Sequence, residues 1–350
     1  MTLAANVLVA LLAIGLLIAL HELGHLVAAR LAGMRVERYS IGFGWVLARR
    51  RFGDTEYCLS AIPFGGYVKI AGMAPGEDEG DPRAFHRRPL LARVFVIAAG
   101  PLANELVAVL LVYAVALAGM PYTKVARVGQ VLPESAAAAA GLSPGDLVRG
   151  VNGAAVTSFP DLVAAIRSHP GETVALEIDR DGKPRRILVQ LGTPPFLGVS
   201  APLRRFSPIA AVPAAIGWTV RQTAWVVTGT LSAFRHPHAA QLEGPIGTIQ
   251  TTAKEAEHGW QSLVFTLALL SLALAVFNVL PWPSLDGGRL LFLLFEILLR
   301  RPVNRRIEMA VHAIGMVFLI ALVVLVTVGD VRRLAGGAGP PPAGGADAGR

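Results

Sequence analysis

The 350-residue sequence contains one cysteine, Cys58, and few charged residues for its length. A single cysteine excludes an intrachain disulfide framework and any zinc site built from cysteines. Only 16% of the residues are charged and 53% are hydrophobic, whereas soluble domains average about 25% charged and about 45–50% apolar residues. This balance argues against a purely soluble enzyme. Glycine and proline are frequent but follow no collagen-like period, which argues against a fibrous protein.

Four long apolar runs contain much of the hydrophobic content, at residues 3–20, 90–120, 262–280 and 310–328. A helix needs about 20 apolar residues to cross a bilayer, so each run predicts a transmembrane helix. The helical pattern of the first run continues to Ala29. No lysine or arginine precedes Arg30, and a cleaved signal peptide, which has a basic N-terminal region, is therefore not expected.

The segment between the second and third runs has a different character. Over residues 121–202 it alternates short strand, helix and turn patterns, and two alternating strands flank an Asp-Gly pair, which is a strong hairpin signal. A helical pattern begins near Ser158 or Asp161, either of which can cap it. We therefore expect a small α+β domain inserted into a membrane protein. Residues 203–260 then predict an interfacial helix, with Trp218 and Trp225, and a connection.

The positive charges indicate how the chain is oriented. Residues 30–93 hold eleven lysines and arginines and residues 289–306 hold five, whereas the longer segment 124–254 holds thirteen. Basic loops lie on the cytoplasmic side of membrane proteins. This places the first two segments in the cytoplasm, and the N-terminus and the inserted domain outside. The net charge of +8 is thereby explained by topology, and no nucleic-acid partner is expected.

The sequence HELGH at residues 21–25 predicts a zinc site. On a helix, His21 and His25 face the same way and can bind one zinc ion, while Glu22 can accept a proton from the water that the metal activates. Ionisable residues near a membrane span are expensive and usually functional. The alternative is a helix end whose polar residues mark the membrane interface.

A catalytic zinc site needs a third protein ligand, and Asp286 is the best candidate. It follows the third apolar run in the sequence PWPSLDGG, where prolines end the helix and glycines allow close backbone approach. If the second run spans the membrane, the first and third runs end on the same, cytoplasmic side. His21, His25 and Asp286 can then share a metal; if the second run does not span, the two motifs lie on opposite faces and cannot. The alternative for Asp286 is a solvated turn after a helix.

Several segments together resemble the site-2 proteases, and in particular the bacterial regulator-of-sigma-factor type with one PDZ-like domain. The resemblance covers nearly the whole chain and rests on HELGH at 21–25, GPLAN at 100–104, the insert, and NVLPWPSLDGG at 278–288. PFGGYVKI at 63–70 and GPIGTIQ at 244–250 are similar too. The resemblance implies that His21, His25 and Asp286 bind one Zn²⁺ and that Glu22 is the general base.

The resemblance also implies two substrate-binding elements. Asn278 matches an asparagine that lies near the substrate backbone in the family; otherwise it packs between helices. A membrane-associated β element at residues 40–70, with Gly65, Gly66 and Tyr67, would present the substrate as an extended strand, because a helical peptide bond is not accessible to attack. The alternative is a plain cytoplasmic hairpin.

The implied fold is a polytopic α-helical membrane protein with four transmembrane helices, a membrane-associated β-hairpin element and one inserted α+β PDZ-like domain. Its divisions are a first membrane half at 1–120, the extracytoplasmic domain at 121–202, the interfacial segment at 203–260, a second membrane half at 261–334 and a disordered tail at 335–350.

The implied function is an intramembrane zinc endopeptidase of the bacterial cytoplasmic membrane. Its expected partners are the lipid bilayer and single-span membrane proteins already shortened by a site-1 protease, such as anti-sigma factors or remnant signal peptides. Three alternatives remain: a non-catalytic PDZ scaffold, a zinc carrier, and another metalloprotease with Glu296 or Glu308 as its third ligand. Whether the PDZ-like domain binds a C-terminus or filters bulky substrates stays open.

Overall fold

The computed structural model describes residues 3–73, 80–235, 244–257 and 259–335. The chain forms two compact units, one of Met1–Ala114 with Val212–Pro341 and the other built around Val115–Ala211. The predicted tail at 335–350 lies outside the described residues, apart from its first residue.

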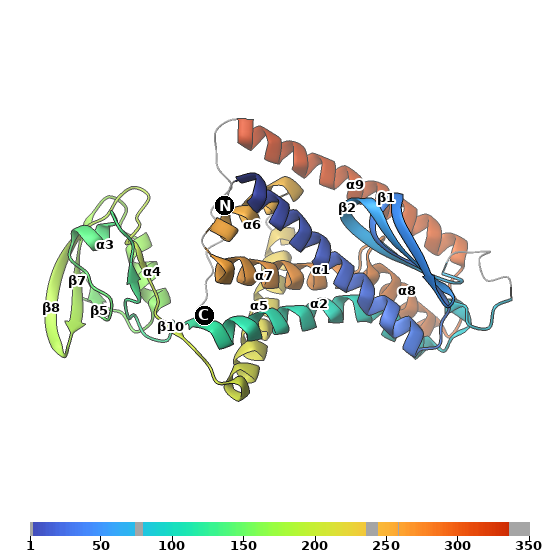
Figure 1. Ribbon diagram of the computed structural model, residues 1–350, viewed down its shortest axis with the longest axis horizontal. Helices are drawn as coiled ribbons and strands as arrows, with labels where there is room; N and C mark the ends of the chain where they lie inside the picture. The colour runs from blue at the N-terminus through green and yellow to red at the C-terminus, as the bar shows by residue number, and fades with distance from the viewer. Residues whose placement is uncertain (1–2, 74–79, 236–243, 258, 336–350) are drawn as a thin grey trace. The chain divides into compact units, whose positions relative to one another are not determined.

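Long helices dominate the first unit (Figure 1). They are α1 (Leu3–Leu31), α2 (Leu90–Ala118), α5 (Pro208–Arg235), α6 (Pro245–Glu257), α7 (Trp260–Val279), α8 (Asp286–Leu299) and α9 (Arg305–Ala335). Four of them, α1, α2, α7 and α9, are long and apolar enough to cross a membrane. This confirms the four predicted apolar helices. The segment predicted as one interfacial helix and a connection contains two helices, α5 and α6.

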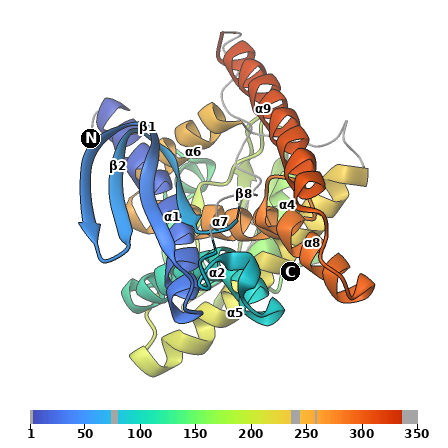
Figure 2. The same cartoon turned by 90° about the vertical axis from the view of Figure 1, so that its right-hand side faces the viewer.

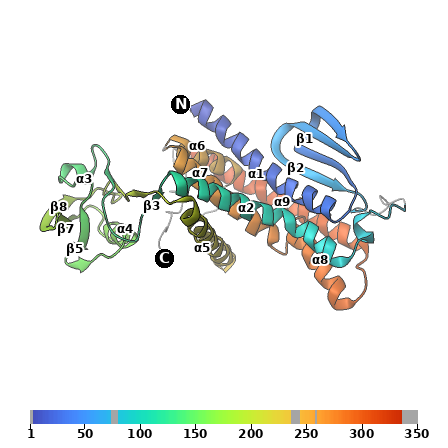
Figure 3. The same cartoon turned by 60° about the horizontal axis from the view of Figure 1, so that its bottom comes forward.

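Close helix contacts bring the first and third spans onto the second. A β-carbon at Gly24 of α1 would lie 2.4 Å from the carbonyl oxygen of Ala99 on α2, so only glycine allows this crossing. The Ser271 hydroxyl of α7 donates to the backbone oxygen of Asn104 on α2, at 2.8 Å. Helix α1 also packs against α6 and α7, as Figure 3 shows. The HELGH turn of α1 is therefore enclosed by neighbouring helices.

Two long antiparallel strands, β1 (Val36–Phe52) and β2 (Thr55–Ile70), form a curved sheet beside α1 (Figure 2). The first half of β1 pairs with both ends of β2, so that Tyr39 lies between Tyr57 and Val68. Register shifts interrupt the pairing, and Gly42, Gly44 and Gly65 have φ values of 84–97° that favour glycine. The sheet therefore folds back on itself rather than forming one simple hairpin.

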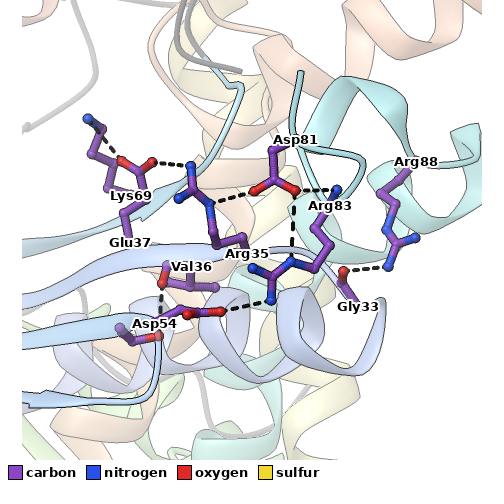
Figure 4. A network of polar contacts seen from close by, with 10 residues as sticks. Gly33, Arg35, Val36, Glu37, Asp54, Lys69, Asp81, Arg83 and Arg88 are labelled. Atoms are coloured by element: carbon purple, nitrogen blue, oxygen red, sulfur yellow. Dashed lines mark hydrogen bonds and ion pairs between the residues drawn. The ribbon is translucent and has the colours of Figure 1, made fainter. Parts of the chain in front are cut away.

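A polar network fixes this sheet to the chain that leads into α2 (Figure 4). Arg35 forms ion pairs with Glu37, at 3.0 Å, and with Asp81, at 2.7 Å. Lys69 forms a further ion pair with Glu37, at 3.1 Å. Arg83 continues the network to Asp54 in the turn between the strands, at 2.8 Å. The network joins both ends of the sheet to a single segment. The 3₁₀ helix η1 (Phe85–Arg87) follows it.

The second unit is a small α+β domain. Its elements are β3 (Met120–Pro121), β4 (Gln130–Val131), α3 (Ala136–Ala139), β5 (Leu147–Val151), β6 (Ala154–Ala155), α4 (Phe159–Arg167), β7 (Thr173–Arg180), β8 (Lys183–Gln190), β9 (Val199–Ser200) and β10 (Leu203–Arg204). The main sheet has the order β6-β5-β7-β8, and β3 pairs with β10 where the chain enters and leaves the unit.

Local sequence signals explain two features of this domain. Asp181 and Gly182, between β7 and β8, both have positive φ, as a tight two-residue hairpin turn requires. Ser158 caps α4 and forms a capping box with Asp161. The domain has its own hydrophobic core, in which Leu162 and Leu176 are at most 1% exposed. It therefore has the means to keep its structure as a separate unit.

Candidate metal centre

Helix α1 places two imidazole rings one turn apart on the same face. His21 and His25 are 6% and 8% exposed, and their Nε2 atoms lie 3.3 Å apart. The HELGH spacing has this effect because residues i and i+4 are neighbours along a helix face. Both rings point their Nε2 atoms at a single position.

Asp286 reaches the same position from a segment 265 residues away in sequence. Its Oδ2 atom lies 3.1 Å from Nε2 of His21 and 3.2 Å from Nε2 of His25. Asp286 is the first residue of α8, and the two residues after it must be glycines. A β-carbon at Gly287 would lie 2.1 Å from the carbonyl oxygen of Leu280, and one at Gly288 would lie 2.4 Å from a carbonyl in the preceding turn.

The chemistry of this donor set fits zinc. His25 Nδ1 lies 2.8 Å from the carbonyl oxygen of Val96, which can only accept a hydrogen bond. In a neutral ring Nδ1 then carries the proton and Nε2 carries a lone pair. This lone pair faces the carboxylate oxygen of Asp286, which is also an acceptor. A cation between them removes this repulsion. The three candidate ligand atoms lie within 4.8 Å of one another, and two histidines with one carboxylate form a known type of catalytic zinc site.

Helix α2 supports the candidate ligands in a way that the sequence analysis did not foresee. Asn104, which is fully buried, lies with its amide nitrogen 3.2 Å from Nδ1 of His21, and its amide oxygen has no hydrogen-bond partner among the described residues. The oxygen and nitrogen of an amide group can trade places by a half-turn without changing its shape. In that orientation the Asn104 oxygen accepts a hydrogen bond from the Nδ1 proton of His21. Such outer contacts fix the tautomer of a metal-binding histidine. The only sequence signal was the GPLAN segment.

The candidate base Glu22 lies between the two histidines and the end of β2. An added β-carbon at Gly66 would lie 3.4 Å from Cγ of Glu22 and 2.7 Å from the carbonyl oxygen of Ser40. The last part of β2 therefore passes close to the base, and glycine permits this approach.

The neighbouring candidates, Gly65 and Tyr67, do not touch the metal position but shape the same part of β2. Gly65 has a φ of 97°, and a β-carbon there would lie 2.1 Å from the ring of Phe43. Tyr67 stacks on Phe43, with ring centroids 6.1 Å apart, and accepts a hydrogen bond from Arg38. These contacts hold the turn that leads into Gly66.

Asn278 lies in the last turn of α7 and is half-buried. Its amide nitrogen donates to the carbonyl oxygen of Leu274, one turn earlier in the same helix, at 2.9 Å. The structure thus gives Asn278 a contact within its own helix, and its predicted role at the substrate stays a prediction.

The acidic residues considered as alternative ligands have other partners. Glu296 forms a largely buried ion pair with Arg93, at 2.7 Å, and Glu308 lies 3.9 Å from His312. Glu105 accepts hydrogen bonds from the Thr223 hydroxyl, at 3.1 and 3.2 Å. Among the described residues, only His21, His25 and Asp286 form a metal-binding group.

Known proteins resemble this chain over nearly its whole length. Residues 9–322 match Peptidase family M50. A protein of Nostoc sp., whose name designates it a candidate zinc metalloprotease, is 34% identical over 94% of this chain and 96% of its own. A similarly named protein of Synechocystis sp. is 35% identical over the same shares. The zinc metalloprotease RasP of Geobacillus kaustophilus is 29% identical over 88% of this chain and 93% of its own.

Proposed function

Because the chain belongs to Peptidase family M50, the site-2 protease family, and is a membrane-embedded zinc metalloendopeptidase, we propose that it cleaves peptide bonds within transmembrane segments of single-span proteins. One observation carries this proposal. His21, Glu22 and His25 lie on a helix long and apolar enough to span a membrane, and Asp286 meets them there. Ionisable residues within a membrane span are costly and mark functional sites, and a site on such a helix suits a substrate that is itself embedded in the membrane.

Each residue of the site has its own role in the proposed reaction. His21, His25 and Asp286 would hold the zinc ion, which when bound activates water and polarises the carbonyl of the scissile bond. Glu22 takes the proton of the attacking water and passes it to the leaving amine. Asn104 and the Val96 carbonyl keep the two imidazoles in the tautomer that presents Nε2 to the metal. The dry surroundings strengthen each of these electrostatic contacts.

The end of β2 presents the substrate in an extended form. Gly66 lies against Glu22, so a peptide paired with this strand would have its backbone beside the general base. Gly65 and Tyr67 shape the turn before it. A transmembrane helix must unwind to expose a peptide bond, and backbone pairing with a strand supplies the hydrogen bonds that unwinding removes. Asn278 would orient the same strand.

The basic segments at 30–93 and 289–306 support an orientation in the bacterial cytoplasmic membrane. The site then lies near the cytoplasmic side, and the N-terminus and the PDZ-like domain at 121–202 lie outside. In this arrangement the domain meets the ectodomain of a substrate first. It would accept substrates already shortened by a site-1 protease, anti-sigma factors or remnant signal peptides among them.

The test compares the wild type with Glu22→Gln on a panel of single-span membrane peptides in detergent or vesicles. Glu105→Gln is the matched control, because Glu105 is also a carboxylate on a spanning helix but binds Thr223. We expect cleavage by the wild type and the control only. Equal cleavage by Glu22→Gln would overturn the assigned base. A wild type that binds zinc and cleaves none of the peptides would instead favour the scaffold or the zinc carrier.

A further inference from the structure

The loop that carries Asp286 is held in an unusual conformation. Ser284, two residues before the aspartate, has a φ of 83°, in the left-handed region that side chains other than glycine rarely adopt. The turn around it is tight, with the Leu285 backbone N–H bonding the Trp282 carbonyl at 3.2 Å. Surrounding contacts must stabilise such a residue, and the position of Asp286 depends on it.

The contacts that stabilise Ser284 come from one residue on α9. The Ser284 backbone N–H donates to Nδ1 of His312, and the Ser284 hydroxyl donates to the backbone oxygen of His312, both at 2.8 Å. His312 is 28 residues away and lies in a helix that otherwise fits a membrane span. Because the backbone N–H of Ser284 needs an acceptor, Nδ1 must be unprotonated and the ring proton lies on Nε2. Nε2 lies 3.9 Å from Oε1 of Glu308.

Two more contacts press the same face of α9 onto the loop. A β-carbon at Gly315 would lie 2.3 Å from the side chain of Pro283 and 2.7 Å from its carbonyl oxygen. The rings of Trp282 and Phe318 lie 5.1 Å apart. Only 6% of the apolar stretch of α9 is buried, so these contacts are among the few that fix this helix; others join Asp330 near its end to Gly244 and Gly247. A helix that is mostly exposed is thus specifically docked on the loop before the third ligand.

We propose that His312 is a positioning residue of the metal centre, which holds Ser284 in its left-handed conformation and thereby sets Asp286 against His21 and His25. The expected effect of His312 on peptide cleavage rests on the proposed function. Its expected effect on zinc binding does not. It assigns α9 a role in the site although α9 supplies no ligand. It also explains a histidine at the start of an otherwise apolar run.

The test uses the full-length protein and measures zinc affinity by competition with a chelator, alongside peptide cleavage. His312→Leu removes the acceptor for Ser284, and we expect its zinc affinity to fall by about 10- to 100-fold. His312→Asn keeps an acceptor oxygen at the place of Nδ1 and should stay within about threefold of the wild type. His312→Gln places its amide one atom further out and should resemble His312→Leu. Phe318→Leu alters the packing of α9 but not the bond to Ser284, and should keep zinc affinity.

A double-mutant comparison separates this role from general helix packing. Glycine adopts positive φ without strain, so the effect of His312→Leu should be smaller in a Ser284→Gly background than in the wild type. Wild-type zinc affinity in His312→Leu would overturn the proposal, as would equal losses in the leucine and asparagine variants. If the wild type binds zinc but cleaves no peptide, the proposed function fails while the affinity series still decides the role of His312.

Discussion

Single contacts behind the candidate ligands decide whether the metal position exists. His21 presents Nε2 to the metal only if its Nδ1 proton has an acceptor, and buried Asn104 is the group within reach, at 3.2 Å. We predict that Asn104→Ala weakens zinc binding by about 10- to 100-fold, the usual cost of losing such an outer contact. Zinc competition with a chelator on the purified protein measures it.

Two variants control this prediction. Asn104→Asp keeps an oxygen that accepts the His21 proton, so it should bind zinc much more tightly than Asn104→Ala. Asn278→Ala removes another amide from a spanning helix, but one that bonds Leu274, and it should leave zinc affinity unchanged. Equal affinity in Asn104→Ala and the wild type would mean that His21 needs no help from α2.

A second decisive contact lies in the α+β domain. Asp146 is 1% exposed and forms two bonds with Arg180, both at 2.7 Å. We predict that Asp146→Ala destabilises the domain by about 2–3 kcal/mol, less than for a fully dry pair because Arg180 is partly exposed. Amide hydrogen exchange of β7 and β8 in the full chain should accelerate by roughly 100-fold. Asp179→Ala, whose partner Arg149 lies 3.6 Å away in an exposed pair, should change little.

The same pair predicts how the stability of the domain depends on pH. Burial raises the pKa of the Asp146 carboxyl. The contacts with Arg180 and the Ser143 backbone N–H lower that pKa by a larger amount, so the net pKa lies below the usual value of aspartate. The unfolded chain then binds more protons than the folded one in acid. The stabilisation is complete above the ordinary pKa of aspartate, about 3.9, and is lost as the pH falls through the lowered value. Amide protection factors, which are corrected for the intrinsic pH dependence of exchange, should fall over this acidic range; constant protection factors would contradict the prediction.

Sequence reasoning works for some of these residues and not for others. The HELGH spacing predicts a shared face for His21 and His25 because both lie on one helix. The roles argued for Asn104 and His312 depend on tertiary contacts between segments far apart in the sequence, which no local spacing reveals. Asp286 was identified through the helix-breaking sequence around it, the topology argument and the family resemblance.

At the scale of elements, the crossing of α1 and α2 leaves no room at the ligand atoms. A β-carbon at Gly100 would lie 2.3 Å from Nε2 of His25 and 2.7 Å from Nε2 of His21. We predict that Gly100→Ala displaces both rings and lowers cleavage by about 100-fold, since a shift of about 1 Å can cost that much. Cleavage rate and bound zinc, measured by metal analysis, are the two readouts.

Gly229→Ala supplies the control for added volume on a helix. Gly229 lies in α5, and a β-carbon there would meet nothing within 4 Å. Helix propensity favours alanine over glycine by about 1 kcal/mol, so this variant should fold at least as well as the wild type and keep its activity. Full zinc content and full cleavage in Gly100→Ala would contradict the close approach of α2 to the ligand atoms.

Secondary-structure elements could be predicted where short stretches of sequence determine them. The Asp-Gly turn between β7 and β8 and the Ser158 cap of α4 follow from short sequence patterns. The fold-back of β1 and β2 does not, because it is fixed by bulges and by the distant network through Asp81. The helix α6 within the predicted connection was likewise not foreseen.

At the scale of the whole molecule, the metal position joins the two halves of the membrane unit. His21 and His25 belong to the first span, whereas Asp286 follows the third. A ligand that binds only the folded arrangement stabilises it, by about 2.7 kcal/mol when its concentration is 100 times the dissociation constant. Zinc should therefore stabilise the helix arrangement in addition to supplying chemistry.

We predict that removing zinc with a chelator lowers the midpoint of thermal unfolding in detergent by roughly 5–10 °C, and that adding zinc back restores it. The physical reason is that, without the cation, Asp286 and the two imidazoles place acceptors against one another at 3.1–3.3 Å. His25→Ala should unfold at the same temperature with and without chelator, because it cannot assemble the site. Glu22→Gln is the matched control: it lacks the base but keeps the three candidate ligands, so it should lose stability on chelation as the wild type does. A chelator effect of equal size in His25→Ala would show that the stabilising zinc binds elsewhere in the chain.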